Sequence, residues 1–266
     1  MDVGKGMKLI KKRVLNFLMY LDTEDQGISK ELIEHGIRER FSVACIKKIL
    51  RPDMKVLDLG ANIGFYALIE AQVVKVVHAL EPVKYNYDLL VKNIKLNRFK
   101  NIFPYRLAIG GLTGITKIFT SRRCNWATIV DKRNCTEDYL ERRERFEKGS
   151  EIVEISKLDD FVDKYAIGKI DLLRMDVEGA EIEIIAGGKE TINNMSKGSY
   201  LVIEIHSSCI KIKERIASMI DNIFGAGFKV IKCMTRLKDI NITDVKDMKD
   251  FLTYKVGCPQ VFFKKC

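Results

Sequence analysis

The segment DLGANIG (residues 58–64) has a composition that suits ligand binding between a strand and a helix. Glycine at positions 60 and 64 lets the backbone turn tightly and approach a ligand without a Cβ in the way. Amides at the start of the following helix can donate hydrogen bonds to an anionic group such as a carboxylate. Asp58 is expected to fix the loop or to face a ligand ammonium group through a water molecule. We therefore predict a binding turn that contains Asp58, Gly60, Asn62 and Gly64.

Glu81 ends a second apolar segment further along the chain. An acidic residue in this place can accept two hydrogen bonds from the vicinal hydroxyls of a ribose, although a plain surface carboxylate is the alternative. The glycines are spaced G-x-x-x-G, which differs from the G-x-G-x-x-G pattern of dinucleotide-binding proteins. Ala108 lies in a segment that suits a turn beside an adenine ring. Together these features favour a nucleoside-containing ligand over a dinucleotide.

Four further polar residues follow two later apolar segments: Asp176, Glu178, Glu204 and His206. The carboxyl ends of neighbouring parallel strands meet at one edge of a sheet, so these side chains are expected to share one mouth. Carboxylates and a histidine can take a proton from a hydroxyl group there. The alternative is structural, with acidic residues at a helix start and His206 acting as a cap or packing group.

A basic loop carries the only tryptophan of the chain, Trp126, close to Arg122 and Arg123. Such a loop can stack on a ring and hold an anion, although a mobile basic loop is the alternative. Residues 136–148 are expected to form a charged helix with Glu–Arg pairs at helical spacing, either solvated or acting as a lid.

Short apolar segments alternate with helical patterns from residue 54 onward, which predicts a doubly wound, mostly parallel α/β sheet. Residues 8–21 are expected to form an amphipathic helix that packs on the domain or lies on a membrane surface. Ser29 is expected to cap the next helix and Gly36 to end it. We expect an N-terminal helical extension over residues 1–50 and one domain over residues 51–266. The predicted strands are 54–59, 75–80, 101–108, 170–175, 200–205, 228–233 and 260–264, with edge strands at 115–120 and 151–158, and the predicted helices are 42–50, 65–72, 85–97, 181–194 and 212–224.

The formal net charge is +10, of which +8 lies in residues 92–148, where fourteen Lys and Arg face six Asp and Glu. A basic surface favours anionic partners, and a solvated charged face is the alternative. The seven cysteines form no CxxC pair and the three histidines are scattered, so no metal site is predicted, although a magnesium ion held by carboxylates is left open. Free, mostly buried thiols and the lack of a signal or membrane segment favour a reduced cytoplasm.

Several segments, in this order, resemble the FkbM family of S-adenosylmethionine-dependent methyltransferases: VLDLGANIGFYAL, ALEPVKYNYDLLVKNIKLN, LAIGG, KLDDF, LLRMDVEGAEIEIIAGGKETI and VIEIH. The upstream segment DQGISKELIEHGIRERFS is similar to one that precedes the domain in archaeal-type members. The resemblance implies a seven-stranded, Rossmann-like class I methyltransferase sheet whose last strand is antiparallel. It also implies S-adenosyl-L-methionine as cofactor and methyl transfer, usually to an oxygen of a sugar or secondary metabolite.

Carried over by position, the resemblance implies that Asp58, Gly60, Asn62 and Gly64 line the cofactor loop. Glu81 would hold the ribose, and Asp176 would lie beside the methionine end and the acceptor. Members often have a Ser-rich loop where this chain has Asn125–Thr128, so the shape of the substrate is left open.

The predicted reaction is O-methylation of a sugar, a lipid-linked glycan or a small metabolite, and the basic surface would suit an anionic one. We expect Asp176 or His206 to act as the base, with Glu178 and Glu204 as orienting groups. An RNA methyltransferase is the first alternative because of the basic segment. The sequence Asp176–Gly179, however, stands where amino-methylating enzymes of this fold carry an Asn/Asp-Pro-Pro-aromatic motif. A catalytically silent cofactor-binding protein is the second alternative.

Overall fold

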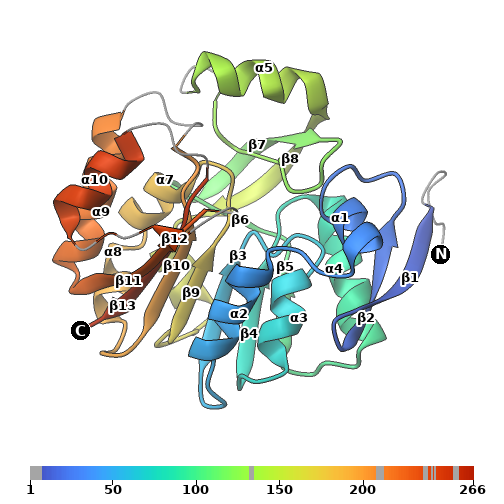
Figure 1. The fold of residues 1–266 in the computed structure, drawn as a ribbon, viewed down its shortest axis with the longest axis horizontal. Helices are drawn as coiled ribbons and strands as arrows, with labels where there is room; N and C mark the ends of the chain where they lie inside the picture. Colours follow the sequence, from blue (N-terminus) through green and yellow to red (C-terminus); the bar gives the residue numbers. More distant parts are fainter. Residues whose placement is uncertain are drawn as a thin grey trace.

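The computed structural model describes residues 8–131, 135–207, 213–235, 239–240, 242, 244–253 and 258–266. Among these residues, eight strands form one large sheet in the order β12-β11-β13-β10-β9-β3-β4-β5 (Figure 1). Strands β5, β4, β3, β9 and β10 run parallel to one another, and β13 is antiparallel to both of its neighbours. Without the two-residue β12, this is the predicted seven-stranded sheet with an antiparallel last strand. The strands are β3 Lys55–Leu59, β4 Val76–Leu80, β5 Ile102–Tyr105, β9 Leu172–Met175, β10 Tyr200–Glu204, β11 Phe228–Met234, β12 Asp239–Ile240 and β13 Gln260–Lys265.

Helices cover both faces of the large sheet because alternate strand residues point to opposite sides. Val56 and Leu172 belong to one buried cluster, whereas Leu57 and Leu173 belong to the other. The first cluster contains apolar residues of α2 Arg40–Ile49, α3 Phe65–Ala71 and α4 Lys84–Leu96. The second contains apolar residues of α6 Leu158–Lys164, α7 Glu181–Ala186, α8 Lys189–Asn194, α9 Lys213–Gly225 and α10 Val245–Thr253.

A second, three-stranded sheet lies over the carboxyl edge of the large one, with the charged helix α5 (Glu137–Phe146) above it (Figure 1). Its strands are β6 Ala108–Ile109, β7 Gly114–Ser121 and β8 Glu147–Ser156. We expect β7 and β8 as edge strands, but they belong to a sheet of their own in which β8 pairs with both β6 and β7. The alternation of apolar residues reveals a half-buried strand without revealing the sheet to which it belongs.

The predicted helix over residues 8–21 is wrong, because this segment is a β-hairpin of β1 Leu9–Val14 and β2 Phe17–Asp22. The buried residues Phe17, Met19 and Leu21 alternate with partly exposed ones, as in a strand. In a short apolar segment, the same residues can fit both helical spacing and strand spacing. The hairpin turn was not recognisable either, because its left-handed residue is Leu15 (φ 52°) rather than a typical turn residue. Within residues 8–50, the part of the extension that the structure describes, the helices are α1 (Ile28–His35) and α2.

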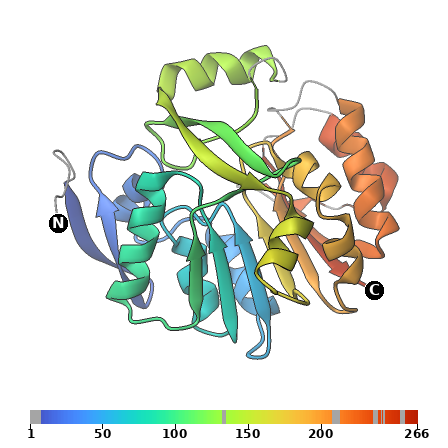
Figure 2. The same ribbon diagram turned by 180° about the vertical axis from the view of Figure 1, so that it is seen from behind.

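Helix α4 lies beside the hairpin (Figure 2). The open edge of β2 pairs with the side chains of Asn93, within α4, and Asn97, at its C-terminal end. Leu18 N donates to Asn97 Oδ1 at 2.9 Å, and Asn97 Nδ2 donates back to Leu18 O at 2.7 Å. Tyr20 N donates to Asn93 Oδ1 at 2.7 Å. The apolar residues of the hairpin belong to the first core cluster, so one core continues from the extension into the sheet.

The helix boundaries near the site differ from the predictions in two places. Helix α1 begins at Ile28, so Ser29 lies inside its first turn, and Asp25 accepts hydrogen bonds from Gly27 N and Ser29 N instead. Gly36 ends α1 in the left-handed conformation, as predicted. The predicted helix 181–194 is divided into α7 and α8 at Gly187 and Gly188.

The described cysteines form no disulfide. Only Cys135 and Cys233 are fully buried, so the thiols are less buried than expected, and Cys209 lies outside the described residues. Of the helices in the described parts of the chain, none has the length and apolar character that a bilayer crossing demands.

Candidate active site

The predicted binding turn connects β3 to α3 at the carboxyl edge of the sheet. Gly60 has φ 78°, and a Cβ there would lie 2.0 Å from the carbonyl oxygen of Asp176. Glycine is therefore required both by the backbone conformation and by the close approach of the β9 end. Gly60 N and Ala61 N both donate to Leu80 O, at 3.0 and 2.9 Å, which ties the turn to the end of β4.

Glu81 is a fixed acceptor next to this turn. Its Oε2 accepts a hydrogen bond from Asn62 N at 3.0 Å, and its Oε1 accepts one from Val83 N at 2.9 Å. Burial raises the pKa of Glu81 to about 7, although the hydrogen bonds from Val83, Asn62 and Asn86 oppose the shift. The carboxylate is thus held rigidly, with its remaining lone pairs available to a ligand.

A cavity of about 800 Å³ opens between this turn, the ends of β4 and β9, and the small sheet. This first cavity is lined by five of the residues predicted to bind cofactor: Gly60, Asn62, Glu81, Ala108 and Asp176. Asp58 and Gly64 are not among its lining residues. Gly64 caps α3 with φ 95° and faces Leu90, so it shapes the turn from behind.

Asp58 forms a buried ion pair beneath the cavity. Arg174 Nη1 donates to Asp58 Oδ1 at 2.7 Å, and Arg174 Nη2 donates to Asp176 Oδ2 at 3.2 Å. The guanidinium also stacks on the ring of Tyr66, with its carbon 3.8 Å from the ring centroid. Arg174 therefore joins the binding turn to the end of β9 and orients Asp176. The sequence reasoning missed this arginine, whose only signal was a charge inside an apolar strand.

The four residues predicted as catalytic do come together, around the imidazole of His206. His206 Nε2 lies 3.5 Å from Glu178 Oε1 and 3.9 Å from both Asp176 Oδ1 and Glu204 Oε1. His206 Nδ1 lies 2.7 Å from Glu181 Oε1. The imidazole is 3% exposed and lines neither of the cavities described here, so it lies behind the carboxylates.

The buried carboxylates change the acid–base character of this cluster. Burial would lower the pKa of His206, but the Glu178 carboxylate, Cys258 and Glu181 raise it well above its ordinary value. Burial raises the pKa of Glu178, and burial together with Asp176 and Glu39 raises that of Glu204 to about 8. Because His206 lines neither cavity whereas Asp176 and Glu204 each line one, these two carboxylates are better placed than the imidazole to act as the base.

A second cavity, of about 770 Å³, lies on the other side of the cluster. Glu204, Glu39 and Phe41 are among its lining residues, and Phe41 is 72% exposed. Arg38 lines the first cavity and its neighbour Glu39 lines the second. Asp176 of the first cavity and Glu204 of the second both face His206 Nε2, so the cavities approach each other at this cluster.

The loop over residues 121–128 closes one side of the first cavity, where the sequence suggested only a basic stacking loop. Cys124 O accepts hydrogen bonds from the side chains of Asn62 at 2.8 Å and Asn86 at 3.0 Å. Thr128 Oγ1 donates to Glu178 O at 2.7 Å. Trp126 stacks with the loop's own Arg123 rather than lining the cavity.

The sequence reasoning missed Arg38, which lines the first cavity together with Cys124 and Asn125 of the basic loop that the sequence singles out. Arg38 is 5% exposed and pairs with Glu39 and, at 3.8 Å, with Glu31. These residues come from the extension and from a loop, so no strand-end pattern could have found them.

A family model described as a methyltransferase FkbM domain matches residues 58–230. The chain belongs to this methyltransferase family. The predicted family and activity class are thereby confirmed, and the matched region contains the binding turn, Glu81 and the carboxylate cluster.

Curated relatives and solved structures extend this result. The chain is 28% identical over 216 residues to methyltransferase sdnD of Sordaria araneosa, covering 71% of this chain and 79% of that protein. It is 52% identical over 40 residues to the 2-O-methyltransferase NoeI of Sinorhizobium fredii, which is 15% of this chain and 16% of that protein. A methyltransferase from Streptococcus mutans solved with SAH has a TM-score of 0.50 at 11% identity, covering 86% and 99% of the chains. Trm5b from Pyrococcus abyssi gives 0.51 at 12% identity, covering 98% of this chain and 57% of that one. At identities this low, the two structures show a shared fold alone.

Proposed function

We propose that this methyltransferase transfers a methyl group from S-adenosylmethionine to a hydroxyl oxygen of a sugar, a lipid-linked glycan or another small metabolite. The observation that carries the proposal is the carboxylate cluster at the place where the two cavities approach each other. A cofactor in the first cavity and an acceptor in the second would meet beside Asp176 and Glu204.

The first cavity fits S-adenosylmethionine. Glu81 offers acceptors to the ribose hydroxyls, and Ala108 lies in the wall beside which an adenine would stack. Gly60 leaves the turn open where the methionine part would pass, and the buried cation of Arg38 suits its carboxylate. The bound cofactor supplies an electrophilic methyl group on a sulfonium.

The second cavity fits a hydroxylated acceptor. The exposed ring of Phe41 can cover the apolar face of a sugar ring, and the carboxylates of Glu39 and Glu204 can accept hydrogen bonds from its hydroxyls. The short match to an enzyme named as a 2-O-methyltransferase also supports oxygen as the acceptor atom.

The chain's own residues align the acceptor and remove its proton. Arg174 fixes Asp176 at the edge of the first cavity, and the end of β10 fixes Glu204 at the edge of the second. Direct displacement requires the acceptor oxygen to lie in line with the methyl group and the leaving sulfur. The hydroxyl proton passes to the carboxylate of Asp176 or Glu204, while His206 positions both carboxylates from behind.

The decisive experiment is an assay of S-adenosylhomocysteine release against a panel of glycans, hydroxylated metabolites, lipids and RNA. It is combined with calorimetry of S-adenosylmethionine, S-adenosylhomocysteine and NAD. We expect both sulfur compounds, and not NAD, to bind and raise the melting temperature. Binding of NAD alone would refute the cofactor, and turnover of RNA alone would replace the hydroxylated metabolite as acceptor.

Asp176→Asn and Glu204→Gln separate the two candidate bases. The variant that removes the base should lose about 10²–10⁴-fold in kcat, while the cofactor dissociation constant stays near that of the wild type. Near wild-type turnover in both variants would exclude this cluster as the site of the reaction.

A further inference from the structure

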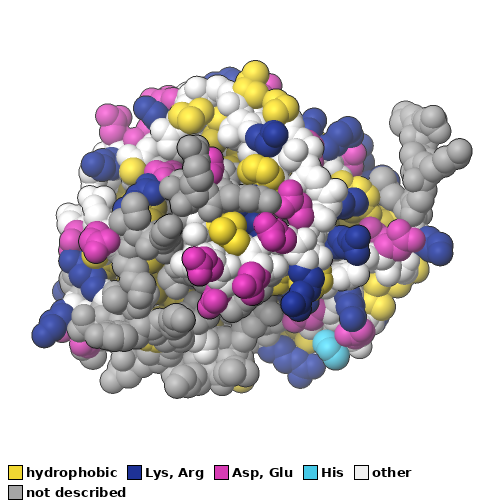
Figure 3. All heavy atoms as spheres, turned by 90° about the horizontal axis from the view of Figure 1, so that it is seen from above, with side chains coloured by type: hydrophobic (Ala, Val, Ile, Leu, Met, Phe, Trp, Pro, Cys, Tyr) yellow, Lys and Arg dark blue, Asp and Glu magenta, His cyan; other side chains and the backbone are white. Residues whose placement is uncertain are grey.

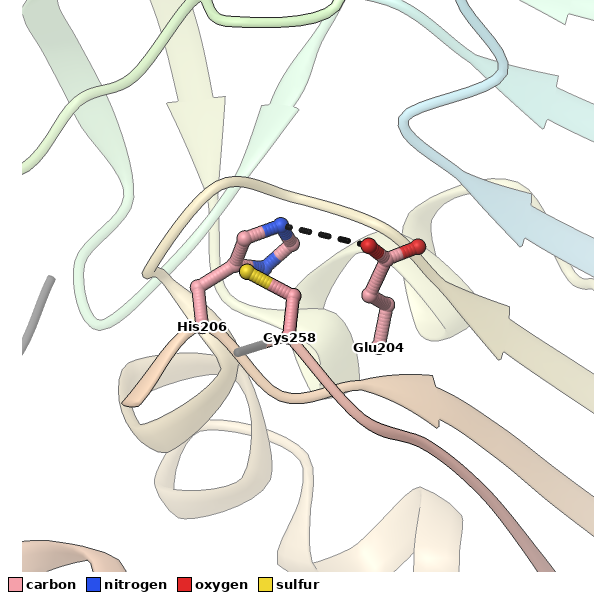
Figure 4. Close-up of side chains that lie close together, drawn as sticks. All are labelled: Glu204, His206 and Cys258. Carbon is pink, nitrogen blue, oxygen red and sulfur yellow. Dashed lines mark ion pairs between the residues drawn. The ribbon is translucent and has the colours of Figure 1, made fainter. Parts of the chain in front are cut away.

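The imidazole of His206 is surrounded by metal-ligating groups. Figure 4 shows Glu204 pointing toward the imidazole across the ion pair with Nε2, and Cys258 beside the ring. Asp176, Glu178 and His206 each offer one ligand atom, and these atoms all lie within 4.8 Å of one another. Glu204 and Cys258 form a second such group with the same histidine.

The distances around Nε2 are those of ligands around an ion. Groups bound about 2.1 Å from a tetrahedral ion lie about 3.4 Å from one another. His206 Nε2 lies 3.5 Å from Glu178 Oε1 and 3.9 Å from Asp176 Oδ1, so a contraction of up to about 0.5 Å would bring both carboxylates to this spacing from the imidazole. Ordinary hydrogen bonds would be shorter, since the usual donor–acceptor distance is about 2.9 Å.

Glu181 provides a second, independent feature of a metal site. Its Oε1 lies 2.7 Å from His206 Nδ1 and also accepts a hydrogen bond from Gly179 N. A carboxylate that holds one imidazole nitrogen fixes the tautomer and directs the lone pair of the other nitrogen outward, as behind most metal-binding histidines. Here the other nitrogen faces the three carboxylates. Glu181 Oε2 is buried with no hydrogen-bond partner within the described parts of the chain.

The charges around the cluster also favour a cation. Arg174 is shared between Asp58 and Asp176, and Arg38 pairs with Glu31 and Glu39. The ion pairs recorded for the described residues give Glu178 and Glu204 no cation other than His206. Buried carboxylates are stable when they are paired or bind a metal.

We propose that Asp176, Glu178 and His206 Nε2 bind a divalent transition ion of the Zn²⁺ class. Glu204 lies next to an open coordination position that faces the second cavity. An imidazole ligand favours Zn²⁺ and similar ions over Mg²⁺, which prefers an all-oxygen set. Three protein ligands and one open position are the arrangement of catalytic rather than structural zinc sites.

The role of the ion, unlike its binding, rests on the proposed function. An acceptor hydroxyl in the open position would give up its proton to Glu204. Its oxygen would then form a bond to the methyl carbon as the carbon–sulfur bond breaks, so the positive sulfonium becomes a neutral thioether. The ion stabilises the alkoxide that develops in this step.

The test uses the full-length protein after removal of metal by a chelator. Co²⁺ and Zn²⁺ are added separately, and binding is followed by calorimetry and by the visible absorption of cobalt. We expect one equivalent of Co²⁺ to give the strong bands of a four-coordinate site, with Zn²⁺ but not excess Mg²⁺ displacing it. Glu178→Gln should abolish or strongly weaken binding, and Glu181→Gln should weaken it about 10–100-fold. Glu183→Gln, a carboxylate on the same segment that pairs with Arg215, should bind like the wild type.

Several outcomes would overturn the proposal. No cobalt binding in the wild-type protein, or equal binding in Glu178→Gln, removes the site. A thiolate-to-cobalt charge-transfer band that disappears in Cys258→Ser assigns the ion to Glu204, His206 and Cys258 instead. Binding of S-adenosylmethionine without metal binding defeats this proposal alone, whereas metal binding without S-adenosylmethionine binding defeats the proposed function alone. Circular dichroism of each variant separates lost ligation from lost folding.

Discussion

Glu81 is the residue whose protonation should control cofactor affinity. Its pKa is raised to about 7 by burial, with hydrogen bonds from Val83, Asn62 and Asn86 opposing the shift and Glu151 adding to it. Ribose hydroxyls donate to the ionised carboxylate, so binding favours the charged form. Below this pKa, Glu81 must lose its proton before the cofactor binds. Above it, the carboxylate is already ionised. Affinity for S-adenosylmethionine should therefore rise by up to about tenfold per pH unit below pH 7 and level off above it.

Calorimetry across this pH range tests the expectation, with Glu81→Gln as the critical variant. The variant should bind more weakly, by about 1.5–3 kcal/mol per hydrogen bond lost, and with a flatter pH profile. Glu151→Gln removes a nearby charge outside the site, so it should only lower the midpoint of the pH profile of binding slightly. A wild-type affinity that is constant with pH would remove Glu81 from the binding site.

Glu70 of α3 is a buried carboxyl group that the site does not use. It is 0% exposed, and neither of its oxygens has a hydrogen-bond partner among the described residues. Burial, and then the charge of Asp58, raise its pKa well above the ordinary value. The folded protein thus binds this proton more tightly than the unfolded chain does. Stability therefore falls as the pH rises from the pKa of Glu70 in the unfolded chain toward its higher pKa in the folded protein.

Glu70→Gln removes this pH-dependent cost. The variant should gain about 1–3 kcal/mol relative to wild type at pH 8 and less at pH 5. Melting curves at both pH values measure the difference, and the exposed Glu34→Gln on α1 serves as the control. A variant that is less stable than wild type at pH 8 would contradict this account.

At the scale of single residues, the sequence predicted which strand-end residues line the first cavity of the candidate site. Gly60, Asn62, Glu81, Ala108 and Asp176 line the first cavity because a parallel sheet brings strand ends to one edge. Arg38 and Cys124 could not be found this way, since tertiary packing alone brings the extension and the 121–128 loop to that edge. His206 was found, but its burial behind three carboxylates was not, because sequence spacing carries no information on depth.

At the scale of elements, the N-terminal hairpin shows how the chain protects an exposed strand edge. Unpaired backbone groups on an edge strand invite pairing with other chains. Asn97 occupies that edge by both accepting from and donating to Leu18. Asn97→Ala removes these two hydrogen bonds and a third to Asn93 O, so it should destabilise the protein by about 1–2 kcal/mol.

Amide hydrogen exchange tests the same substitution locally. The amide of Leu18 should exchange faster in Asn97→Ala, while amides of the distant helix α9 should keep their protection. Unchanged exchange at Leu18 would mean that the asparagine side chain contributes nothing to the edge.

The elements of the large sheet were predictable because each buried parallel strand is a short apolar segment followed by a helical pattern. Apart from β12, which the sequence did not predict, the strands of the large sheet differ from the predicted ones mostly at their ends. The hairpin and the small sheet were misjudged for one common reason. Their strands are amphipathic and their partners are set by tertiary contacts, with α4 for β2 and β6 for β8, which no local pattern encodes.

At the scale of the whole molecule, charge separates the surface from the site. The chain carries +10 overall, concentrated in residues 92–148. The carboxylates of the cluster and of the second cavity make the mouth acidic instead. On the face seen from above, acidic side chains of the described residues occupy the middle and basic ones lie mostly toward the margin (Figure 3). An anionic polymer would therefore be attracted to the margin and repelled at the mouth.

This distribution leads to a prediction about RNA. We expect weak binding without sequence preference, because the contacts would be made to phosphates by Lys and Arg outside the site. Neutralising phosphates releases counterions, so the affinity should fall steeply as salt rises. Fluorescence anisotropy with several unrelated RNAs across a salt series measures both properties. Arg122→Gln with Arg123→Gln should reduce the salt slope, whereas Glu204→Gln should leave it unchanged. Tight, sequence-selective binding that persists at physiological salt would instead show that the basic segment reads RNA, and it would make RNA the leading candidate for the acceptor.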